Sequence, residues 1–263
     1  SVGTWCLDMG GALGGGASTF LYTFREREMI LDVFEELTGC RFHYNHHTVG
    51  GIRHDIPDGW TDRVKHTLTH IEGRIGEYRA MLDDNRIFRA RTVGVGVLDP
   101  VLAMELGISG PNLRASGVDH DLRRDEPYAA YDRVDVRVPV ATEGDCYARY
   151  QMRMAELEES IRIVRLLIDD IPDGPICSLK GVKLAGAVKA KTHCVTYAAI
   201  ESPRGELGTW VIGQKGANPY RCKIRPPSLH SVAALPWLCP GNNLPDIIVV
   251  LGSLDPIMGE VDR

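Results

Sequence analysis

The chain has 263 residues, of which 44% are hydrophobic and 25% are charged, and its net charge is -5. This balance is typical of a globular protein, and it excludes a general affinity for nucleic acid or anionic lipid because such binding requires excess positive charge. The seven cysteines include no Cys-x-x-Cys pair, which argues against a disulfide framework and favours a reducing compartment.

Helical periodicity dominates the first two thirds of the chain. The opening residues, Val2 to Met9, belong to an apolar element, and the chain opens at Ser1 without a Met. Apolar residues recur every three or four positions over 23–38 and 61–82, which predicts two helices separated by a polar loop. The clearest helix is expected over 144–169, before the sequence Pro172-Asp173-Gly174-Pro175 stops it.

The last third predicts a small sheet and a helical tail. Short β-rich runs at 196–200, 208–213 and 220–224 predict strands, with Gly205 and Gly216 in the turns between them. No run of eighteen apolar residues occurs, so we do not expect the chain itself to span a membrane. The expected fold class is α+β, mainly α: one domain over 1–263, in which a helical bundle carries a small antiparallel sheet near the C-terminal third.

A cluster of His and Cys in the polar loop resembles a metal site at first sight. Its members are Cys40, His43, His46, His47 and His54. Three-residue steps suit metal ligands, but a closed site also needs a rigid frame and supporting hydrogen bonds, which a loop does not supply. We therefore expect no metal, and one or two buried, hydrogen-bonded His.

The glycine-rich segment over 10–16 could suggest a phosphate-binding loop. It lacks the Gly-Lys-Ser/Thr of a P-loop and no predicted strand precedes it. Glycine removes side-chain bulk, so another backbone or a flat ligand can approach closely. We expect close packing here rather than a nucleotide site.

The end of the chain carries the most specific signal. An apolar run over 247–251 leads into Gly252, then Asp255-Pro256, then three charged residues. This end resembles that of the D-type subunit family of respiratory and photosynthetic complex I, a family that in turn resembles the nickel–iron hydrogenase large subunit. Hydrogenases end in Asp-Pro-Cys-x-x-Cys-x-x-His, whereas Ile257, Glu260 and Arg263 stand here in register with the two Cys and the His. These three side chains cannot hold a thiolate-ligated nickel, so the resemblance implies the scaffold without the metal.

Further motifs that match the family occur in the same order along nearly the whole chain. They are Phe24-Arg25-Glu26-Arg27-Glu28, Gly50-Gly51-Ile52-Arg53-His54-Asp55-Ile56-Pro57, Leu113-Arg114-Ala115-Ser116-Gly117-Val118-Asp119-His120-Asp121-Leu122-Arg123, Gly144-Asp145-Cys146-Tyr147-Ala148-Arg149-Tyr150 and Pro219-Tyr220-Arg221-Cys222-Lys223-Ile224-Arg225. Family members begin well before Ser1, so we expect a fragment that lacks the family's amino-terminal part.

The resemblance implies a subunit of a complex I-type NAD(P)H- or ferredoxin-linked quinone oxidoreductase, coupled to ion translocation. The expected substrate is quinone. The chain would carry no redox centre or bound metal; an iron–sulfur cluster would lie in a partner subunit and NADH would react elsewhere in the complex. The expected partners are the B-type iron–sulfur subunit, the C-type and I-type subunits and the H-type membrane subunit, and no nucleic acid. The chain would be peripheral, on the cytoplasmic face of the inner (plasma) membrane.

The resemblance also implies which residues line the quinone pocket. The family's quinone-binding His and Tyr lie upstream of Ser1, so no catalytic residue is assigned. The family has an Asp at the position of Leu13, and Asp8, five residues earlier, does not lie on the same face of a helix. The charged tail could instead be a buried ion-pair cluster. The predicted pocket residues are Leu13, Gly15, Ser18, Phe20, Asp255, Pro256, Ile257, Met258, Glu260 and Arg263.

Dense charge alternation over 114–133 allows two interpretations. Most such stretches are solvated loops. The Leu-Arg-x-Ser-Gly frame instead favours structural or interface ion pairs, formed by Arg114, Asp121 and Arg123. Two other functions stay open for the whole chain: a subunit of an energy-converting hydrogenase-related complex, and a scaffold subunit without quinone chemistry.

Overall fold

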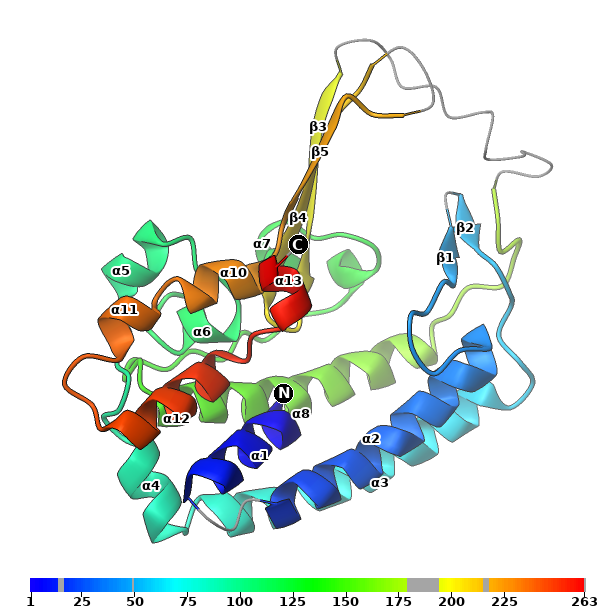
Figure 1. Ribbon diagram of the computed structural model, residues 1–263. Coiled ribbons are helices and arrows are strands. Elements are labelled where there is room, and N and C mark those ends of the chain that lie inside the picture. Colours follow the sequence, from blue (N-terminus) through cyan, green and yellow to red (C-terminus); the bar gives the residue numbers. More distant parts are fainter. Residues whose placement is uncertain (14–16, 49, 179–193, 215–217, 263) are drawn as a thin grey trace.

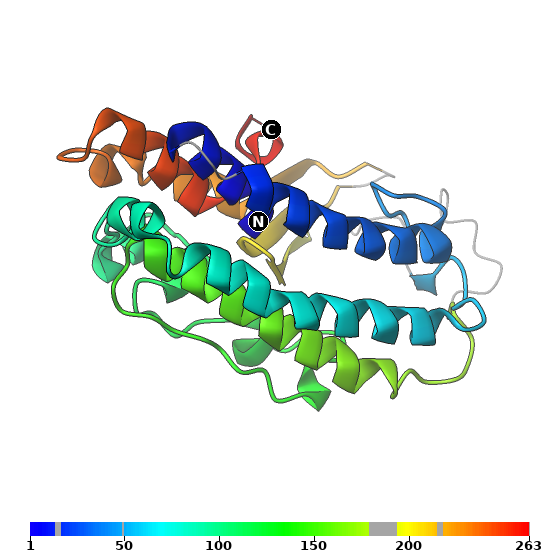
Figure 2. The same ribbon diagram turned by 90° about the horizontal axis from the view of Figure 1, so that it is seen from below.

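The computed structural model describes residues 1–13, 17–48, 50–178, 194–214 and 218–262. The expected fold class, α+β and mainly α, is confirmed. Three long helices run side by side: α2 (Ala17–Thr38), α3 (Trp60–Leu82) and α8 (Cys146–Ile168) (Figure 2). Helix α1 (Val2–Leu13) packs against α2 and against α12 (Leu244–Leu254), so the first and last parts of the chain lie together (Figure 1).

The predicted long helices agree with the structure to within two residues, except at one start. Helix α2 begins at Ala17 rather than at residue 23. Asp145 fixes the start of α8, because its carboxylate accepts the backbone N–H of Ala148 at 2.7 Å. The same carboxylate accepts the N–H of Gly94 at 2.7 Å, which attaches the preceding loop to this helix.

Short helices between α3 and α8 escaped the sequence analysis. A helix of four to seven residues shows too few turns for periodicity to be detected, and it depends on caps and tertiary packing. Asn85 and Asp99 each accept two backbone N–H groups at such a start. These elements are α4 (Arg86–Thr92), α5 (Pro100–Glu105), α6 (Pro111–Arg114), α7 (Leu122–Asp125) and the 3-10 helix η1 (Tyr131–Arg133).

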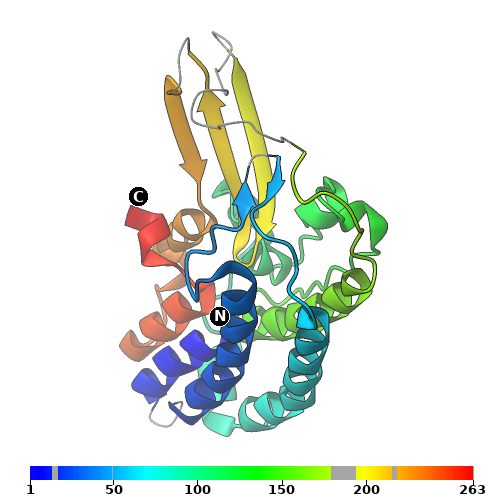
Figure 3. The same ribbon diagram turned by 90° about the vertical axis from the view of Figure 1, so that its right-hand side faces the viewer.

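The predicted sheet is confirmed and its first two strands are longer than expected. Strands β3 (Val195–Ser202), β4 (Gly205–Ile212) and β5 (Arg221–Arg225) form an antiparallel sheet in that order. Gly205 is the first residue of β4 rather than part of the turn, and Gly216 lies outside the described residues. The sheet stands out from the helical body (Figures 1 and 3). A short hairpin, β1 (His47–Thr48) and β2 (Gly51–Ile52), occurs in the expected polar loop.

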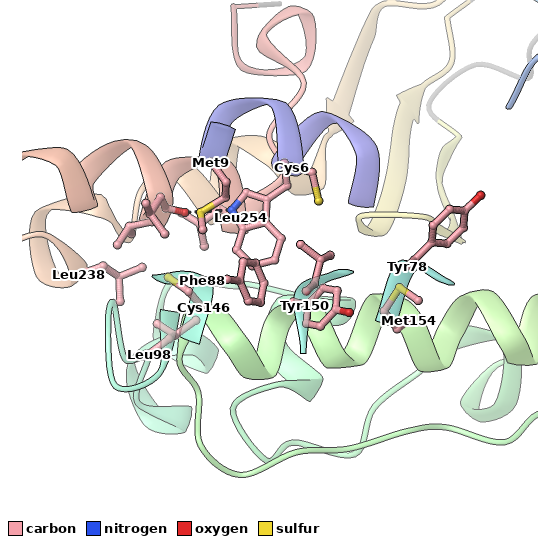
Figure 4. Packing of buried hydrophobic residues seen from close by; sticks show 14 of the residues in the cluster. Cys6, Met9, Tyr78, Phe88, Leu98, Cys146, Tyr150, Met154, Leu238 and Leu254 are labelled. Carbon is pink, nitrogen blue, oxygen red and sulfur yellow. Dashed lines mark hydrogen bonds between the residues drawn. The ribbon is translucent and has the colours of Figure 1, made fainter. Parts of the chain in front are cut away.

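One hydrophobic core joins α1, α3, α4, α8 and α12 (Figure 4). Its centre is aromatic: the ring of Trp5 lies 5.7 Å from that of Phe88 and 5.9 Å from that of Tyr150, centroid to centroid. The Trp5 Nε1–H also donates to the carbonyl of Val249 at 3.2 Å. These contacts fix the opening helix against the C-terminal helix.

The tail after β5 consists of short helices that end near the start of the chain (Figure 1). A capping box formed by Asn243 and Asp246 starts α12. The other tail helices are α10 (Pro227–Val232), α11 (Leu235–Leu238) and α13 (Met258–Asp262). Within the described residues, no helix combines the length and apolar character needed to cross a membrane.

The two leucines at the ends of α12 offer a matched test of this packing. Leu254 is 1% exposed, and Leu244 is 80% exposed. We predict that Leu254→Ala lowers the free energy of unfolding by about 2–5 kcal/mol, because it leaves a cavity in the core. Leu244→Ala should change it by less than about 0.5 kcal/mol. Urea unfolding of both variants measures this difference, and equal effects would contradict the placement of α12.

Candidate functional site

A buried carboxylate, Asp255, joins three separate parts of the fold. Asp255 caps the C-terminus of α12 in a left-handed conformation (φ 53°, ψ 53°) and is 6% exposed. Arg204, from the turn between β3 and β4, donates to the Asp255 carbonyl at 2.9 Å and to its Oδ1 at 3.1 Å. Arg153, from α8, places its Nε 4.0 Å from Oδ2. We call these three residues the Asp255 site.

The charges of the Asp255 site are strongly coupled. Burial opposes ionisation of Asp255, but Arg153, Arg204 and the amino group of Ser1 together outweigh burial and hold the pKa of its carboxyl below the usual value. Burial also lowers the pKa of the Arg153 guanidinium. At 4.0 Å, Arg153 Nε and Asp255 Oδ2 are too far apart for a hydrogen bond, and neither atom has another partner within the described residues.

A second carboxyl lies close to this site, on the seam between α1 and α12. At Gly252, a Cβ atom would stand 2.7 Å from Trp5 Cδ1 and 3.0 Å from Asp8 Oδ2, so only glycine permits this approach. The pKa of Asp8 is raised, mainly by burial and to a smaller extent by the negative charge of Asp255. Neighbouring carboxyls with opposite shifts are suited to separate acid and base roles. The sequence analysis had not selected Asp8, although a lone acid in an otherwise apolar helix is a detectable signal.

The structure places the start of α1, rather than its end, beside the C-terminal tail. Helix α1 runs antiparallel to α12, with Ser1 beside Asp255 and Trp5 beside Val249. Leu13 is therefore at the far end of α1, about 18 Å from Ser1 by helical rise.

The opening segment of the predicted pocket is described only in part. Leu13 and Ser18 belong to α1 and α2, but their side chains lie outside the described parts, as do Gly15 and Arg263 altogether. The Phe20 ring lies 4.1 Å from that of Phe24.

The end of the chain combines buried anchors with outward-facing apolar side chains. Ile257 donates its N–H to Ser228 Oγ at 3.1 Å, and the Ser228 hydroxyl donates to Glu260 Oε2 at 2.5 Å. Pro256 is half-buried, whereas Ile257 is 40% and Met258 60% exposed. The backbone of this segment is thus fixed, while two apolar side chains stay available to another molecule.

The predicted ion-pair residues converge on Arg114, which is buried. Arg114 donates to Glu156 Oε1 at 2.7 Å and to Glu201 Oε1 at 2.9 Å, and it lies 3.3 Å from Asp121 Oδ2. Arg123 contacts both carboxylate oxygens of Asp121, at 2.9 and 2.6 Å. Arg114, Asp121 and Arg123 are therefore buried ion pairs within the chain, and their role in a contact with another subunit stays a prediction.

The acids of this network titrate differently. Burial opposes ionisation of Asp121, but Arg123 and Arg114 outweigh it and lower the pKa of Asp121. Burial raises the pKa of Glu201 despite its contact with Arg114.

A cavity of about 580 Å³ adjoins this network, between α2, α3, α8 and the turn after β3. Its lining combines apolar and charged side chains. None of the predicted quinone-pocket residues whose side chains are described lines it. Arg153 belongs to both this cavity and the Asp255 site. Representative lining residues are Ile71, Met154, Leu157, Arg114, Arg153 and Glu201.

The His cluster is more dispersed than its spacing suggests. His46 is buried, as expected for one His of the loop, but its Nδ1 has no hydrogen-bond partner within the described residues. The pKa of His46 is lowered, mainly by burial and to a smaller extent by the nearby charges of His47 and His54. In the described ranges, no three His, Cys, Asp or Glu side chains converge closely enough to hold a metal ion.

Comparisons with known proteins cover nearly the whole chain. The family model for the 49 kDa subunit of the respiratory-chain NADH dehydrogenase matches residues 14–263. The D-type subunit of the NADH-quinone oxidoreductase from Geobacillus thermodenitrificans is 44% identical over 261 residues, 99% of this chain and 69% of that protein. A D-type subunit of the same enzyme from Rhizobium etli is 43% identical over 270 residues, covering 95% of this chain and 67% of that protein.

A solved structure shows the same similarity in three dimensions. The structure of the membrane-bound sulfane sulfur reductase, an archaeal respiratory membrane complex, contains a chain that superposes with a TM-score of 0.92. Its sequence is 33% identical, and the match covers 100% of this chain and 71% of that chain.

Removing the central cation of the Arg114 network should destabilise the protein strongly. We predict that Arg114→Met lowers the free energy of unfolding by about 3–5 kcal/mol, because it leaves buried carboxylates without their partner. Arg124→Met removes an exposed Arg that pairs with Asp119 and Asp125, and should cost less than about 1 kcal/mol. Urea unfolding at pH 7 measures both free energies. Similar losses of unfolding free energy in the two variants would show that the buried position of the network does not increase its contribution to stability.

The raised pKa of Asp8 predicts a pH-dependent effect of Asp8→Asn. Below about pH 3.9 the carboxyl is protonated in the folded and unfolded states, so its ionisation contributes nothing to stability. As the pH rises through the folded-state pKa, the buried charge destabilises the wild type.

Asp8→Asn should therefore gain stability relative to the wild type as the pH rises from about 3.9, until the carboxyl is fully ionised in the folded state. Urea unfolding across this range measures the difference, with the exposed Asp84→Asn as the control for loss of one carboxylate. A difference that does not change with pH would contradict the assignment.

Proposed function

The chain belongs to the family of the 49 kDa subunit of the respiratory-chain NADH dehydrogenase and is a subunit of an oxidoreductase complex, and on this basis we propose that it forms one wall of the slot in which that complex reduces quinone. The proteins that it resembles at 43–44% identity are named as D-type subunits of NADH-quinone oxidoreductases. The observation that carries the proposal is the pair of adjacent carboxyls, Asp8 and Asp255, between the first helix and the tail.

Quinone reduction requires two protons and develops negative charge on the carbonyl oxygens. Asp8 suits the role of proton donor, because its raised pKa keeps the carboxyl protonated at a higher pH than that of an ordinary Asp. Asp255 stays ionised, and its charge contributes to the shift at Asp8. Arg153 and Arg204 are positioning residues that hold Asp255 in place. When bound in a partner subunit, an iron–sulfur cluster would supply the electrons.

Ile257 and Met258 would form the apolar part of the wall. Ligand sites for flat organic molecules are mostly apolar with a few placed polar groups. Both side chains are exposed next to Asp255, so the B-type iron–sulfur subunit would close the slot over them. The C-type and I-type subunits and the H-type membrane subunit would complete the assembly, attach this chain to the cytoplasmic face of the membrane, and couple the reaction to ion translocation.

The structural similarity to the sulfane sulfur reductase supports a second candidate function. The same fold, at a TM-score of 0.92, occurs in a complex whose name specifies a different electron acceptor. A complex with that acceptor would not need a proton donor for quinone. The purified complex distinguishes the two, because quinone and sulfane sulfur reduction can be measured separately, and metal analysis of the same sample tests for a hydrogenase-type nickel.

Enlarging the apolar wall tests the slot directly. We predict that Ile257→Trp in the purified complex lowers inhibitor-sensitive quinone reduction about tenfold or more, an effect of about 1.4 kcal/mol on the barrier, because the indole narrows the slot. Val101→Trp, at an exposed position on α5, should leave the rate unchanged. An assembled Ile257→Trp complex with unaltered rate and inhibitor sensitivity would show that the tail does not line the quinone site.

A further inference from the structure

One face of the protruding sheet has a regular composition across its three strands. Residues directly opposite in an antiparallel sheet point to the same face. Three rows of opposite residues cross this face from β3 through β4 to β5: Val195, Ile212 and Arg221; Tyr197, Trp210 and Lys223; and Ala199, Gly208 and Arg225. In the first two rows, a large apolar or aromatic residue stands on β3 and on β4, and a cation stands on β5. We call this surface the basic–aromatic face.

The large side chains of this face are solvent-accessible. Val195, Tyr197 and Trp210 are all exposed, as are the cations Arg221 and Lys223. The face lies on the part of the sheet that stands out from the helices (Figure 3). Exposed aromatic residues combined with Arg are enriched at protein–protein interfaces relative to other surfaces.

The cations of this face differ in how they are compensated. Arg225 is neutralised by Glu206 at 3.5 Å, and it also donates to the carbonyl of Gly107 at 2.5 Å. Arg221 and Lys223 form no ion pair within the described residues. The ranges outside the description contain no Asp or Glu, so every acidic side chain of the chain has been considered. In a chain of net charge -5, this edge is locally positive and uncompensated.

The face also contains a groove of about 390 Å³ where the sheet meets α10. Tyr197, Trp210 and Lys223 form its sheet side, and Leu229 and His230 form its helix side. His230 is fixed by a contact of 2.9 Å between its Nδ1 and the carbonyl of Leu106. The groove thus offers an apolar recess next to a cation that no carboxylate of the described residues neutralises.

Internal contacts hold this groove in shape. The Tyr197 hydroxyl donates to Glu206, the same residue that pairs with Arg225. The Tyr197 ring crosses the sheet over Gly208, where a Cβ atom would collide with the Tyr197 hydroxyl oxygen. Glycine at this position is therefore needed for the aromatic ring to lie flat. A recess that is ordered before binding reduces the entropy lost on association.

We propose that the basic–aromatic face binds an extended acidic segment of another protein subunit. Arg221 and Lys223 are two residues apart on one strand, a spacing of about 7 Å, which matches carboxylates at alternate positions of an extended partner along the β5 edge. An apolar side chain of the same segment would occupy the groove against Trp210. The inference rests on the proposed function only in requiring that the chain works within a multisubunit complex.

An anionic membrane surface is the alternative occupant of a face with free cations, and the crosslinking experiment below distinguishes it from a protein segment. A shaped groove of fixed aromatic side chains is instead a feature of recognition of a particular side chain.

Charge reversal in the assembled complex tests the proposal. Lys223→Glu should weaken association of this chain with the rest of the complex about tenfold, so that it dissociates at a lower salt concentration in size-exclusion chromatography. Arg86→Glu, an exposed charge reversal at the start of α4, is the matched control and should dissociate like the wild type. Lys223→Gln should give an intermediate effect, and far-UV circular dichroism of each variant verifies folding. Dissociation of Lys223→Glu at the wild-type salt concentration would overturn the proposal.

A photocrosslink identifies the partner. Tyr220→p-benzoylphenylalanine, at an exposed position next to β5, should crosslink to an acidic segment of another subunit in the intact complex. Crosslinking only to lipid, together with binding of the purified chain to vesicles that contain phosphatidylserine, would overturn the proposal in favour of a membrane surface. If neither the protein crosslink nor the weaker association of Lys223→Glu is observed while the complex still reduces quinone, only this inference is contradicted. If the protein crosslink forms in a complex that does not reduce quinone, only the proposed function is contradicted.

Discussion

The fold around the proposed site depends on how Asp255 is held. Its backbone ends α12 in a left-handed conformation, and its carboxylate pairs with Arg204 from the sheet turn and with Arg153 from the long helix α8. These three elements are far apart in the sequence, and removing either cation would leave the buried anion only partly compensated. The ion pairs therefore attach the end of α12 to the sheet turn and to α8, while Ser228 fixes the backbone of the next residues at Ile257.

The packing of α1 on α12 gives this structural feature a chemical consequence. Trp5 anchors α1 to the backbone of α12, and Gly252 leaves space for Asp8. The fixed negative charge of Asp255 then helps to raise the pKa of Asp8. An ionised carboxylate held by arginines and a neighbouring carboxyl whose pKa is raised arise from the same few contacts, and this is the basis of the quinone-slot proposal.

Sequence alone predicted the long helices, the three-stranded sheet and the family, because periodicity and ordered motifs extend over many residues. It missed short helices such as α4, whose start depends on the Asn85 cap and on packing. It selected Arg114 and Asp121 correctly as ion-pair residues, since their motif was specific. Residue order does not reveal that α1 runs antiparallel to α12, which brings Ser1 rather than Leu13 next to Asp255, so the predicted pocket residues stay a prediction. Asp8 was not selected because a step of five residues does not keep a side chain on one face of a helix.

Photoaffinity labelling with an azido-quinone in the intact, respiring complex tests the central claim most directly. If the α1–α12 seam and the tail form a wall of the slot, labelled peptides of this chain should contain Asp8 or residues 255–258, and excess unlabelled quinone or a quinone-site inhibitor should prevent the labelling. Labelling that instead falls on the cavity between α2, α3 and α8, or on other subunits alone, would contradict the account.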